Sequence, residues 1–480
     1  MQHRATEEHV NMKKYAAGIT LLGLFCLFGC QSSDPKERVV VADIAITDIT
    51  VIDALRGVRV NQTVWLKGDE IVGVTSDFAP GFAAEEKIDG QGKYLIPGLS
   101  DMHVHITYEP ALTDVMPSLF LDYGVTSVRD TGGLLALLQP QIDQWRAAGA
   151  IAPRIYFSGP LLDGAKVVYD GYNRPQIGVA NATVQSAKRQ VARLAAAGVD
   201  FIKIYELVSP QVFDALVAAA NAYDLPIAAH VPLALEVSMA GPRVDSMEHL
   251  RNVELSCAED AEGLLTERRG RLFESNAVSG YQLRSEIHSH FRPLALAHLK
   301  LDSARCRGVI GSLRQTIQVP TLRLNTIARY SPLLRDDWLA VLARLPESVA
   351  LRWQATAQGY AGKATLSHEE MVDWSLALVG AMQRAGVPIG AGTDTPIGQA
   401  IPGYSLHTEL ERLVQAGLSP LQALSAATVR PAQFLGLQDS HGAIEAGYVA
   451  DLVILAQDPL TDIRHTRSIA AVISKGQRVR

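Results

Sequence analysis

The sequence predicts an α/β protein: a (β/α)8 TIM-type barrel with a small β-sandwich domain built from both chain termini. Two observations predict this architecture. Between residues 98 and 435, short apolar strands alternate with helical segments, and about eight strand–helix units fit into that length. Residues 43–97 and 440–480 instead contain short alternating apolar runs broken by Gly, Asn and Asp, which is typical of β-strands and turns.

The two terminal segments resemble each other more than either resembles the chain between them. Strands at both ends of a chain can pair and close one small domain around the intervening residues. We therefore expect residues 43–97 and 440–480 to form a composite β-sandwich domain, and residues 98–439 to form the barrel.

The strands expected for the barrel follow one another as short apolar runs. After "YLIPGLSDMHVH" they are "VTSVRDTG", "RIYFSGP", "DFIKIYEL", "PIAAHVP", "VDSMEHL", "QVPTL" and "VPIGAGTD". Several of the helical stretches between them end in Gly just before the next strand, as a helix C-cap does. This alternation predicts parallel strands, and their number favours a barrel over an open sheet.

Residues 255–315 carry many charges and no clear strand. We expect a mostly helical insertion after the sixth strand, which either covers the mouth of the barrel or stabilises its outer wall. The insertion contains Cys257 and Cys306. In an oxidising compartment they can form a disulfide, whose loop closure contributes about 4 kcal/mol; two buried free thiols are the alternative.

The N-terminus indicates export. Residues 12–30, "MKKYAAGITLLGLFCLFGC", combine two lysines, an apolar run too short to span a membrane, and a small residue before Cys30. The end of this run resembles a bacterial lipobox. We expect residues 1–30 to be a lipoprotein signal peptide, Cys30 to be lipidated, and residues 31–42 to form a tether. Gln31 favours the outer membrane, facing the periplasm; an ordinary signal peptide cleaved elsewhere is the alternative.

Composition narrows the class of protein. Hydrophobic residues make up 48% and charged residues 20%, so the chain can bury a large core and is not disordered. The net charge is −6 and no basic run is present, which argues against a nucleic-acid partner. The lipid is the only membrane contact we expect, and the sequence does not specify an oligomeric state.

Metal-ligating residue types stand at the ends of five predicted strands. In a strand, side chains two residues apart point to the same face, so the two histidines of "MHVH" converge on one point, where imidazoles suit zinc. Active sites of such barrels lie at the C-terminal ends of the strands. The expected cluster comprises His103, His105, Lys203, His230, His249 and Asp394.

These motifs resemble the metal-dependent amidohydrolase superfamily, in particular its imidazolonepropionase-like and prolidase-like branch. The matching stretches are "IPGLSDMHVH", "VTSVRDTGG", "FIKIY", "AAHVP", "MEHL", "GAGTD" and "GAIEAGYVADLVILAQDPL". The resemblance runs from about residue 43 to 480 and is weakest in the insertion. It specifies the superfamily more closely than the substrate.

The resemblance implies a binuclear centre in which a lysine carbamate, formed with carbon dioxide, bridges two divalent cations, zinc or manganese. His103, His105, Lys203 and Asp394 would hold one cation, and Lys203, His230 and His249 the other. An apolar run surrounds Lys203, where carbamylation would turn a costly buried ammonium into a neutralised anion. The alternative is a lysine whose ammonium reaches the rim.

The implied mechanism is hydrolysis by a hydroxide that two cations about 3.5–4 Å apart share. Asp394 would take its proton and pass it to the leaving amine. We therefore expect a hydrolase of amide bonds, a prolidase-like dipeptidase. Lys203 argues against imidazolonepropionase activity, since those enzymes use one metal and lack this lysine. Cyclic amides, lactones or phosphoesters are alternative substrates, and a surface-anchored binding protein with a vestigial site is the alternative of another class.

Substrate contacts are expected from aromatic and basic residues near the mouth. Tyr205 shares a strand face with Lys203, and the loop "YDGYNRP" after the third strand offers Tyr169, Tyr172 and Arg174. They would contact a small molecule or dipeptide. His288 and His290 also form a His-x-His pair, but in a predicted helix, where residues two apart do not share a face; we do not expect them to be ligands.

Overall fold

The structure, a computed structural model, describes residues 39–76, 81–172, 174–274, 276–277, 279–360 and 366–480. The expected signal peptide, the lipidation site at Cys30 and most of the expected tether lie outside these residues. No described helix is long and apolar enough to cross a membrane. Residues 40–480 form a compact unit of their own.

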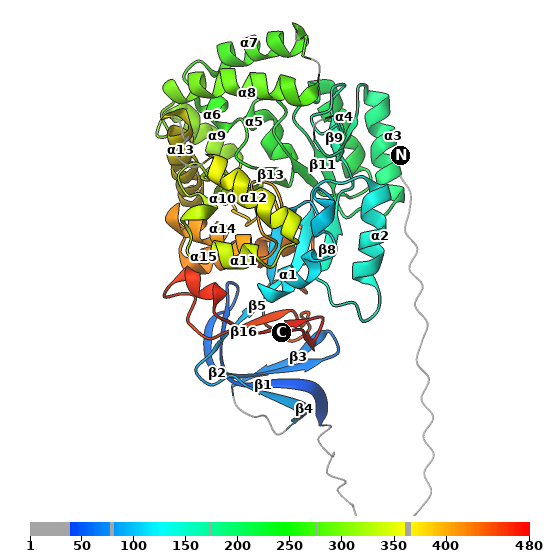
Figure 1. Ribbon diagram of the computed structural model, residues 1–480, viewed down its shortest axis with the longest axis vertical. Coiled ribbons are helices and arrows are strands. Elements are labelled where there is room, and N and C mark those ends of the chain that lie inside the picture. The colour runs from blue at the N-terminus through cyan, green and yellow to red at the C-terminus, as the bar shows by residue number, and fades with distance from the viewer. Residues whose placement is uncertain (1–38, 77–80, 173, 275, 278, 361–365) are drawn as a thin grey trace, which may run out of the picture. The chain divides into compact units, whose positions relative to one another are not determined.

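Strands from both ends of the chain pair in one sheet. Its order is β17-β16-β15-β5-β1-β2-β3, with β4 paired to β1, and β5 and β15 form the antiparallel junction between the two terminal segments. Figure 1 shows the red C-terminal strand β16 among the blue N-terminal strands. The strands are β1 Val40–Asp53, β2 Gly57–Lys67, β3 Glu70–Thr75, β4 Phe82–Asp89, β5 Tyr94–Pro97, β15 Leu452–Leu455, β16 Ile469–Ser474 and β17 Gln477–Arg478.

The terminal sheet differs from the expectation in two respects. Its ladder is continuous rather than divided between two separate sheets, because the long strand β1 pairs with β2 along one edge and with β4 and then β5 along the other. β1 also begins at Val40, inside the segment expected to be a tether, because Val40 already pairs with Phe82 of β4.

The chain between the terminal segments contains two parallel sheets. One has the order β6-β7-β8 and the other the order β10-β9-β11-β12-β13-β14, and all their pairs are parallel. The strands are β6 Leu99–Val104, β7 Val125–Asp130, β8 Arg154–Phe157, β9 Leu161–Asp163, β10 Gly178–Ala180, β11 Ile202–Ile204, β12 Ile227–Ala229, β13 Ser246–Glu248 and β14 Ile317–Val319. The short strands β9 and β10, which the sequence analysis missed, follow β8.

The expected eighth strand, residues 387–394, is not a continuous strand, and the irregular segment 388–395 takes its place. Two isolated parallel bridges, Gln318 to Ile389 and Val104 to Thr395, place it between β14 and β6. On the other side, the amide of Asp200 donates to the carbonyl of Phe157 at 2.9 Å, which links the β8 end to the β11 end. The ladder breaks at residues 388–395 because Asp394 has a positive φ of 61°, which extended strands do not adopt.

Helices follow most of these strands, and their apolar faces pack on them to form the main core (Figure 1). α3 shows why helices start where they do: Thr183 and Ser186 form a reciprocal capping box at its N-terminus. The helices are α1 Met116–Asp122, α2 Leu135–Arg146, α3 Val184–Ala196, α4 Pro210–Asn221, α5 Val237–Ala240, α6 Val253–Cys257, α7 Ala261–Glu274, α8 Gly280–Ala297, α9 Ala304–Ser312, α10 Leu322–Asn325, α11 Trp338–Leu342, α12 Glu347–Tyr360, α13 Leu366–Arg384, α14 Tyr404–Gln415, α15 Pro420–Ala426 and α16 Val429–Phe434.

The segment expected to be a helical insertion contains helices α6 to α9. α7 and α8 lie side by side (Figure 1) and share a small core with Leu265, Leu283 and Phe291. A disulfide joins Cys257 of α6 to Cys306 of α9, 49 residues apart. This segment is therefore cross-linked at its base and packed on the strands, and one face of α8 reaches the site described next.

Candidate metal centre

The six expected ligands line one cavity of about 150 Å³. His103 lies in β6 and Lys203 in β11, whereas His105, His230 and His249 each come directly after the last residue of a strand. Asp394 lies in the bridged segment 388–395. Strand ends therefore bring together residues that are separated by up to 291 positions in the sequence.

The four imidazoles form a continuous row along this cavity. Ring centroids lie 5.3 Å apart for His105 and His103, 4.6 Å for His103 and His249, and 4.7 Å for His249 and His230. All four residues are at least 96% buried. Burial lowers the pKa of His230 to about 3 and that of His249 well below its ordinary value. Although burial lowers it, the contact with Asp394 raises the pKa of His105.

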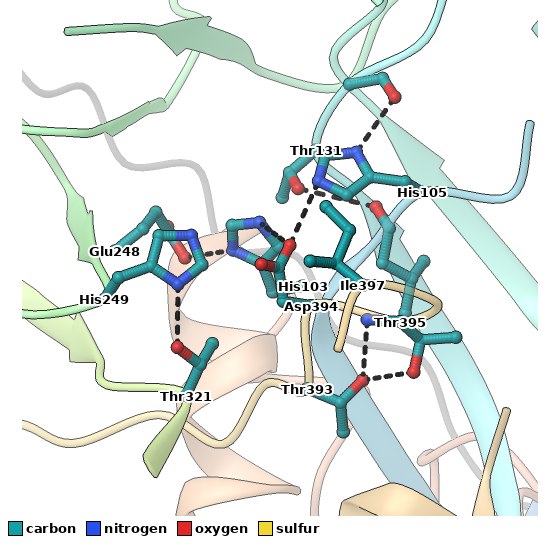
Figure 2. A network of polar contacts seen from close by, with 12 residues as sticks. His103, His105, Thr131, Glu248, His249, Thr321, Thr393, Asp394, Thr395 and Ile397 are labelled. Carbon is teal, nitrogen blue, oxygen red and sulfur yellow. Dashed lines mark hydrogen bonds and ion pairs between the residues drawn. The ribbon is translucent and has the colours of Figure 1, made fainter. Parts of the chain in front are cut away.

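Hydrogen-bond partners fix the tautomers of His105 and His249. Nδ1 of His105 lies 3.0 Å from the carbonyl oxygen of Gly132, which can only accept, so Nδ1 carries the proton. Nδ1 of His249 lies 2.7 Å from Oγ1 of Thr321 (Figure 2), and that hydroxyl donates to the carbonyl of Pro320 at 2.8 Å. Thr321 therefore accepts from His249, and Nε2 keeps its lone pair in both rings.

Carboxylates fix the tautomers of the other two rings, those of His103 and His230. Nδ1 of His103 donates to Oε2 of Glu248 at 2.6 Å, and Nδ1 of His230 donates to Oε1 of Glu206 at 2.7 Å. All four imidazoles thus use Nδ1 for a protein partner and keep an Nε2 lone pair. Metal-ligating histidines are held in this way, because the partner of one nitrogen orients the other nitrogen toward the cation.

Asp394 completes a group of three side chains whose donor atoms lie close enough together to hold one metal ion. Its Oδ1 lies 3.3 Å from Nε2 of both His103 and His105 (Figure 2), and donor atoms of the three residues all lie within 4.8 Å of one another. This oxygen is buried and accepts no hydrogen bond among the described residues. Although burial raises it, His249 and His103 bring the pKa of Asp394 well below its ordinary value, so the carboxylate is ionised.

Lys203 is the buried cation of the site. Its side chain is fully buried, Nζ has no hydrogen-bond partner in the described part of the chain, and its ion-pair distance to Oε1 of Glu248 is 3.9 Å. Burial lowers the pKa of Lys203 to about 8, which raises the fraction of neutral amine, the form that reacts with carbon dioxide. Such an unpartnered amine is costly in an apo protein and fits a lysine that is modified when metals bind.

The sequence analysis missed the two carboxylates that hold the rings. Oε1 of Glu248 accepts from Arg129 at 2.8 Å and from Ser246 at 2.9 Å, so both its oxygens are used. Oε2 of Glu206 accepts from Nε2 of His288 at 2.5 Å. The signal was available, since each stands at the end of a ligand-bearing strand, in "IYEL" and "MEHL". The two histidines of the His-x-His pair in α8 thus face different carboxylates, because Nε2 of His290 lies 3.3 Å from Glu267.

The backbone is strained where the ligands sit. Of the ten described non-glycine residues with positive φ, five lie at the ends of β13, β14 and the 388–395 segment. They are His249, Leu250, Asn252, Thr321 and Asp394. Conformations of this kind cost about 1–3 kcal/mol each and concentrate at functional sites. The strain therefore supports a functional role for this end of the strands.

Gly392 allows the 388–395 segment to approach β6 closely. A Cβ at this position would lie 2.6 Å from Cγ1 of Val319 and 2.8 Å from Cβ of His103. We expect Gly392→Ala to destabilise the protein by about 1–3 kcal/mol and, by displacing His103, to weaken metal binding about 10-fold or more. Chemical denaturation and metal titration measure the two effects. Gly311→Ala in α9, where nothing lies within 4 Å of the new Cβ, is the control and should leave metal binding unchanged.

The expected substrate contacts divide into two pairs. Tyr169 and Tyr205 line the cavity with ring centroids 5.9 Å apart, and Tyr205 stacks at 4.3 Å on His230. Tyr172 and Arg174 are not among the residues that line it, so substrate contact by these two residues stays a prediction. Tyr172 is 69% exposed in a turn that Asp170 caps, and Arg174 donates to the hydroxyl of Tyr281 at 2.8 Å.

Comparisons with known proteins agree with this geometry. A model of the amidohydrolase family matches residues 316–480. The imidazolonepropionase of Pseudomonas putida is 26% identical over 80% of this chain and 84% of its own length. Among solved structures, a Xaa-Pro dipeptidase with bound methionine covers 91% of this chain and 99% of its own at 18% identity, with a TM-score of 0.64. Bottromycin amidohydrolase covers 91% and 86% at 22% identity, with a TM-score of 0.68.

Two further similarities are short. The adenine deaminase of Edwardsiella ictaluri is 33% identical over 18% of this chain, and the ochratoxinase of Aspergillus niger is 39% identical over 17%. These matches span only 15% and 16% of the two relatives' own lengths. The solved structures show that the fold is shared. They do not show that the activities are shared.

Proposed function

We propose that this protein is a metal-dependent hydrolase of amide (C–N) bonds of the amidohydrolase superfamily, and specifically a prolidase-like dipeptidase. The observation that carries the proposal is the set of six predicted ligands around one cavity, with every imidazole keeping its Nε2 lone pair. Similarity to imidazolonepropionase over most of the chain, and to the fold of a Xaa-Pro dipeptidase, supports the same class.

The donors fit two divalent cations. We propose that His103, His105 and Asp394 hold one, that His230 and His249 hold the other, and that Lys203 bridges them as a carbamate. The orphaned Nζ of Lys203 and the unpartnered Oδ1 of Asp394 are the observations that fit this assignment. Divalent cations bound there would polarise the scissile carbonyl and lower the pKa of the attacking water.

The protein's own groups would position the substrate and move one proton. The ionised carboxylate of Asp394 would accept the proton of the attacking water and deliver it to the leaving amine nitrogen. Burial raises the pKa of Tyr205 well above its ordinary value, so its hydroxyl stays protonated and can donate a hydrogen bond to substrate. The apolar side chains of Leu161, Leu324 and Ile397 in the cavity wall would limit competing water beside them.

Two further proposals concern architecture and location. We propose that the two parallel sheets and residues 388–395 form one closed barrel; the bridges to β14 and β6 and the bond between Asp200 and Phe157 support this. We also propose export and a lipid anchor at Cys30 on the outer membrane, facing the periplasm, which rests on residues 12–30 of the sequence alone.

Removal of metal tests the proposed function. Exhaustive chelation should abolish hydrolysis of Xaa-Pro dipeptides, and zinc or manganese should restore it, because the divalent cations would polarise the carbonyl and lower the pKa of the attacking water. Metal analysis of the restored protein should give about two ions per chain, the number that the six donors can hold. Full activity of a verified metal-free sample would overturn the proposal, and metal content below one ion per chain would instead favour a vestigial binding protein.

A second candidate is hydrolysis of a cyclic amide. The specific observation behind it is the match to imidazolonepropionase, which extends over 385 residues. A panel that sets dipeptides against hydantoins, lactones and phosphoesters separates the candidates. The dipeptidase proposal expects the highest kcat/KM for dipeptides.

A further inference from the structure

Two arginines stand in the wall of the metal cavity. Arg251 follows His249 at the end of β13, and Arg284 comes from α8 in the insertion. Their side chains are 14% and 13% exposed. Nε of Arg251 has no hydrogen-bond partner among the described residues, and Nε of Arg284 meets only the carboxylate of Glu206, at 3.1 Å. Two guanidinium groups are thus held at the cavity without the bidentate carboxylate partner that a buried arginine normally has.

Glu206 is the acid nearest to both arginines, and it is heavily shared. Its Oε1 lies 3.1 Å from Nε of Arg284 and 3.9 Å from Nε of Arg251, and it also accepts from His230. Its Oε2 accepts from His288. One carboxylate with four neighbours can balance one of the two guanidinium charges, so the second is left without a counter-charge.

No other acid that the structure describes on the surrounding elements supplies the missing charge. Glu254 pairs with Arg292, two turns further along α8, at 3.4 Å. Asp163 of β9, near Glu206, accepts from the backbone amides of Gly164, Val168 and Leu207, and Asp394 faces His103 and His105. Apart from Lys203, which is an anion as the proposed carbamate, the described cavity wall therefore keeps an excess of one positive charge, which favours an anionic group on whatever binds there.

We propose that Arg251 and Arg284 bind a carboxylate of the substrate next to the scissile amide, and that α8 thereby selects substrates with a free C-terminal carboxylate. This inference rests on the proposed function and deepens it. A guanidinium pair matches the two oxygens of a carboxylate in charge and in hydrogen-bonding geometry. Dipeptides and N-acyl amino acids carry that group, whereas neutral cyclic amides and lactones do not.

The insertion then has a role in specificity that the barrel ends alone do not provide. α8 contributes Arg284 to the cavity and His288 to Glu206, and Glu206 holds the ring of His230. Burial and the nearby Arg292 keep the pKa of His288 well below its ordinary value, so His288 is neutral and adds no third charge. One helix thus connects the carboxylate contact to the orientation of a metal-ligand ring.

Matched substrate pairs test the inference. We would measure kcat and KM for a panel of Xaa-Pro dipeptides and N-acetyl amino acids, each as the free acid and as the carboxamide. The wild-type protein should prefer the acid by at least about 100-fold in kcat/KM, because the amide leaves a buried charge unpaired. Arg284→Met and Arg251→Met should reduce this preference to below about tenfold, mainly through KM for the acid, with little change for the amide.

Three controls keep the result interpretable. Arg271→Met removes an exposed arginine of the neighbouring helix α7 without touching the cavity, and it should retain the wild-type preference. Arg284→Lys keeps the charge but loses the planar fork, and it should give an intermediate preference. Metal content of each variant separates loss of substrate contact from disturbance of His230 through Glu206. Calorimetry with L-proline and L-prolinamide measures carboxylate binding independently of turnover.

The outcomes distinguish this inference from the proposed function. Equal hydrolysis of acid and amide by a metal-loaded protein overturns the carboxylate contact and leaves the hydrolase intact. A metal-loaded protein that hydrolyses neither member of any pair, and binds L-proline no better than L-prolinamide, overturns the carboxylate contact as well. Absence of both bound metal and hydrolysis overturns the proposed function, and the inference falls with it.

Discussion

Lys203→Met should abolish hydrolysis while making the metal-free protein more stable. The loss of activity should exceed about 100-fold, because changes to residues that merely orient metal ligands already cost 10–100-fold. The gain in stability follows from burial: the ammonium of Lys203 is fully buried without a hydrogen-bond partner, and methionine fills the same volume without a charge. We expect the free energy of unfolding of the metal-free protein to increase by on the order of 2 kcal/mol.

The pH dependence of stability checks the second half of this prediction. Burial lowers the pKa of Lys203 to about 8 in the folded chain, below its ordinary value, so the unfolded chain binds the proton more tightly. The free energy of unfolding of chelated wild-type protein should therefore rise as the pH increases from about 8 towards 10. Lys203→Met should lack that rise. Urea titrations at several pH values measure the difference.

The carbamate can be tested on the same residue. Metal-loaded wild-type protein supplied with 13C-bicarbonate should show a carbamate carbon signal by NMR, and Lys203→Ala should not. Short carboxylic acids should partly restore the activity of Lys203→Ala, because they can occupy the space of the missing bridge. A fully active Lys203→Ala would remove the lysine from the site. Lys166→Ala, a half-buried lysine outside the metal cavity, is the matched control.

The convergence of the six proposed ligands on one cavity could be predicted from sequence, because each of them obeys a local rule. Period-two spacing put His103 and His105 on one face, and strand–helix alternation put His230, His249 and Asp394 at strand ends. These rules need no knowledge of what packs against what. They found all six cavity residues but not the four Nδ1 partners, which fix the direction of each lone pair.

The other residues of the site could not be predicted, because contacts between segments that are far apart in the sequence bring them together. His288 meets Glu206 across 82 residues, and Arg284 reaches the same carboxylate from the insertion, which the sequence assigned either to the barrel mouth or to the outer wall. Nothing in the local sequence of α8 distinguishes these inward side chains from exposed ones such as Arg271 of the neighbouring helix α7. The irregular 388–395 segment was also missed, because a positive φ at a non-glycine residue leaves no trace in a pattern of apolar residues.

Asp394→Asn should reduce kcat by more than about 100-fold and leave the fold intact. The substitution keeps the size of the side chain but removes both the negative charge and the ability to accept a proton, so transfer from water to the leaving amine is lost; general acid–base catalysis alone contributes about 10²–10⁴-fold. The loop should survive, because Arg323 donates to the carbonyls of Thr393, Ile397 and Gly398 independently of the carboxylate.

A control substitution at a remote carboxylate separates loss of catalysis from loss of stability. Asp53→Asn alters an equally buried carboxylate in the terminal sheet, where it accepts from the amides of Leu55 and Arg56, and it should change stability without changing kcat. Metal content and a denaturation curve for both variants separate the two effects. If Asp394→Asn retained near wild-type kcat with two metals bound, another group would have to carry the proton.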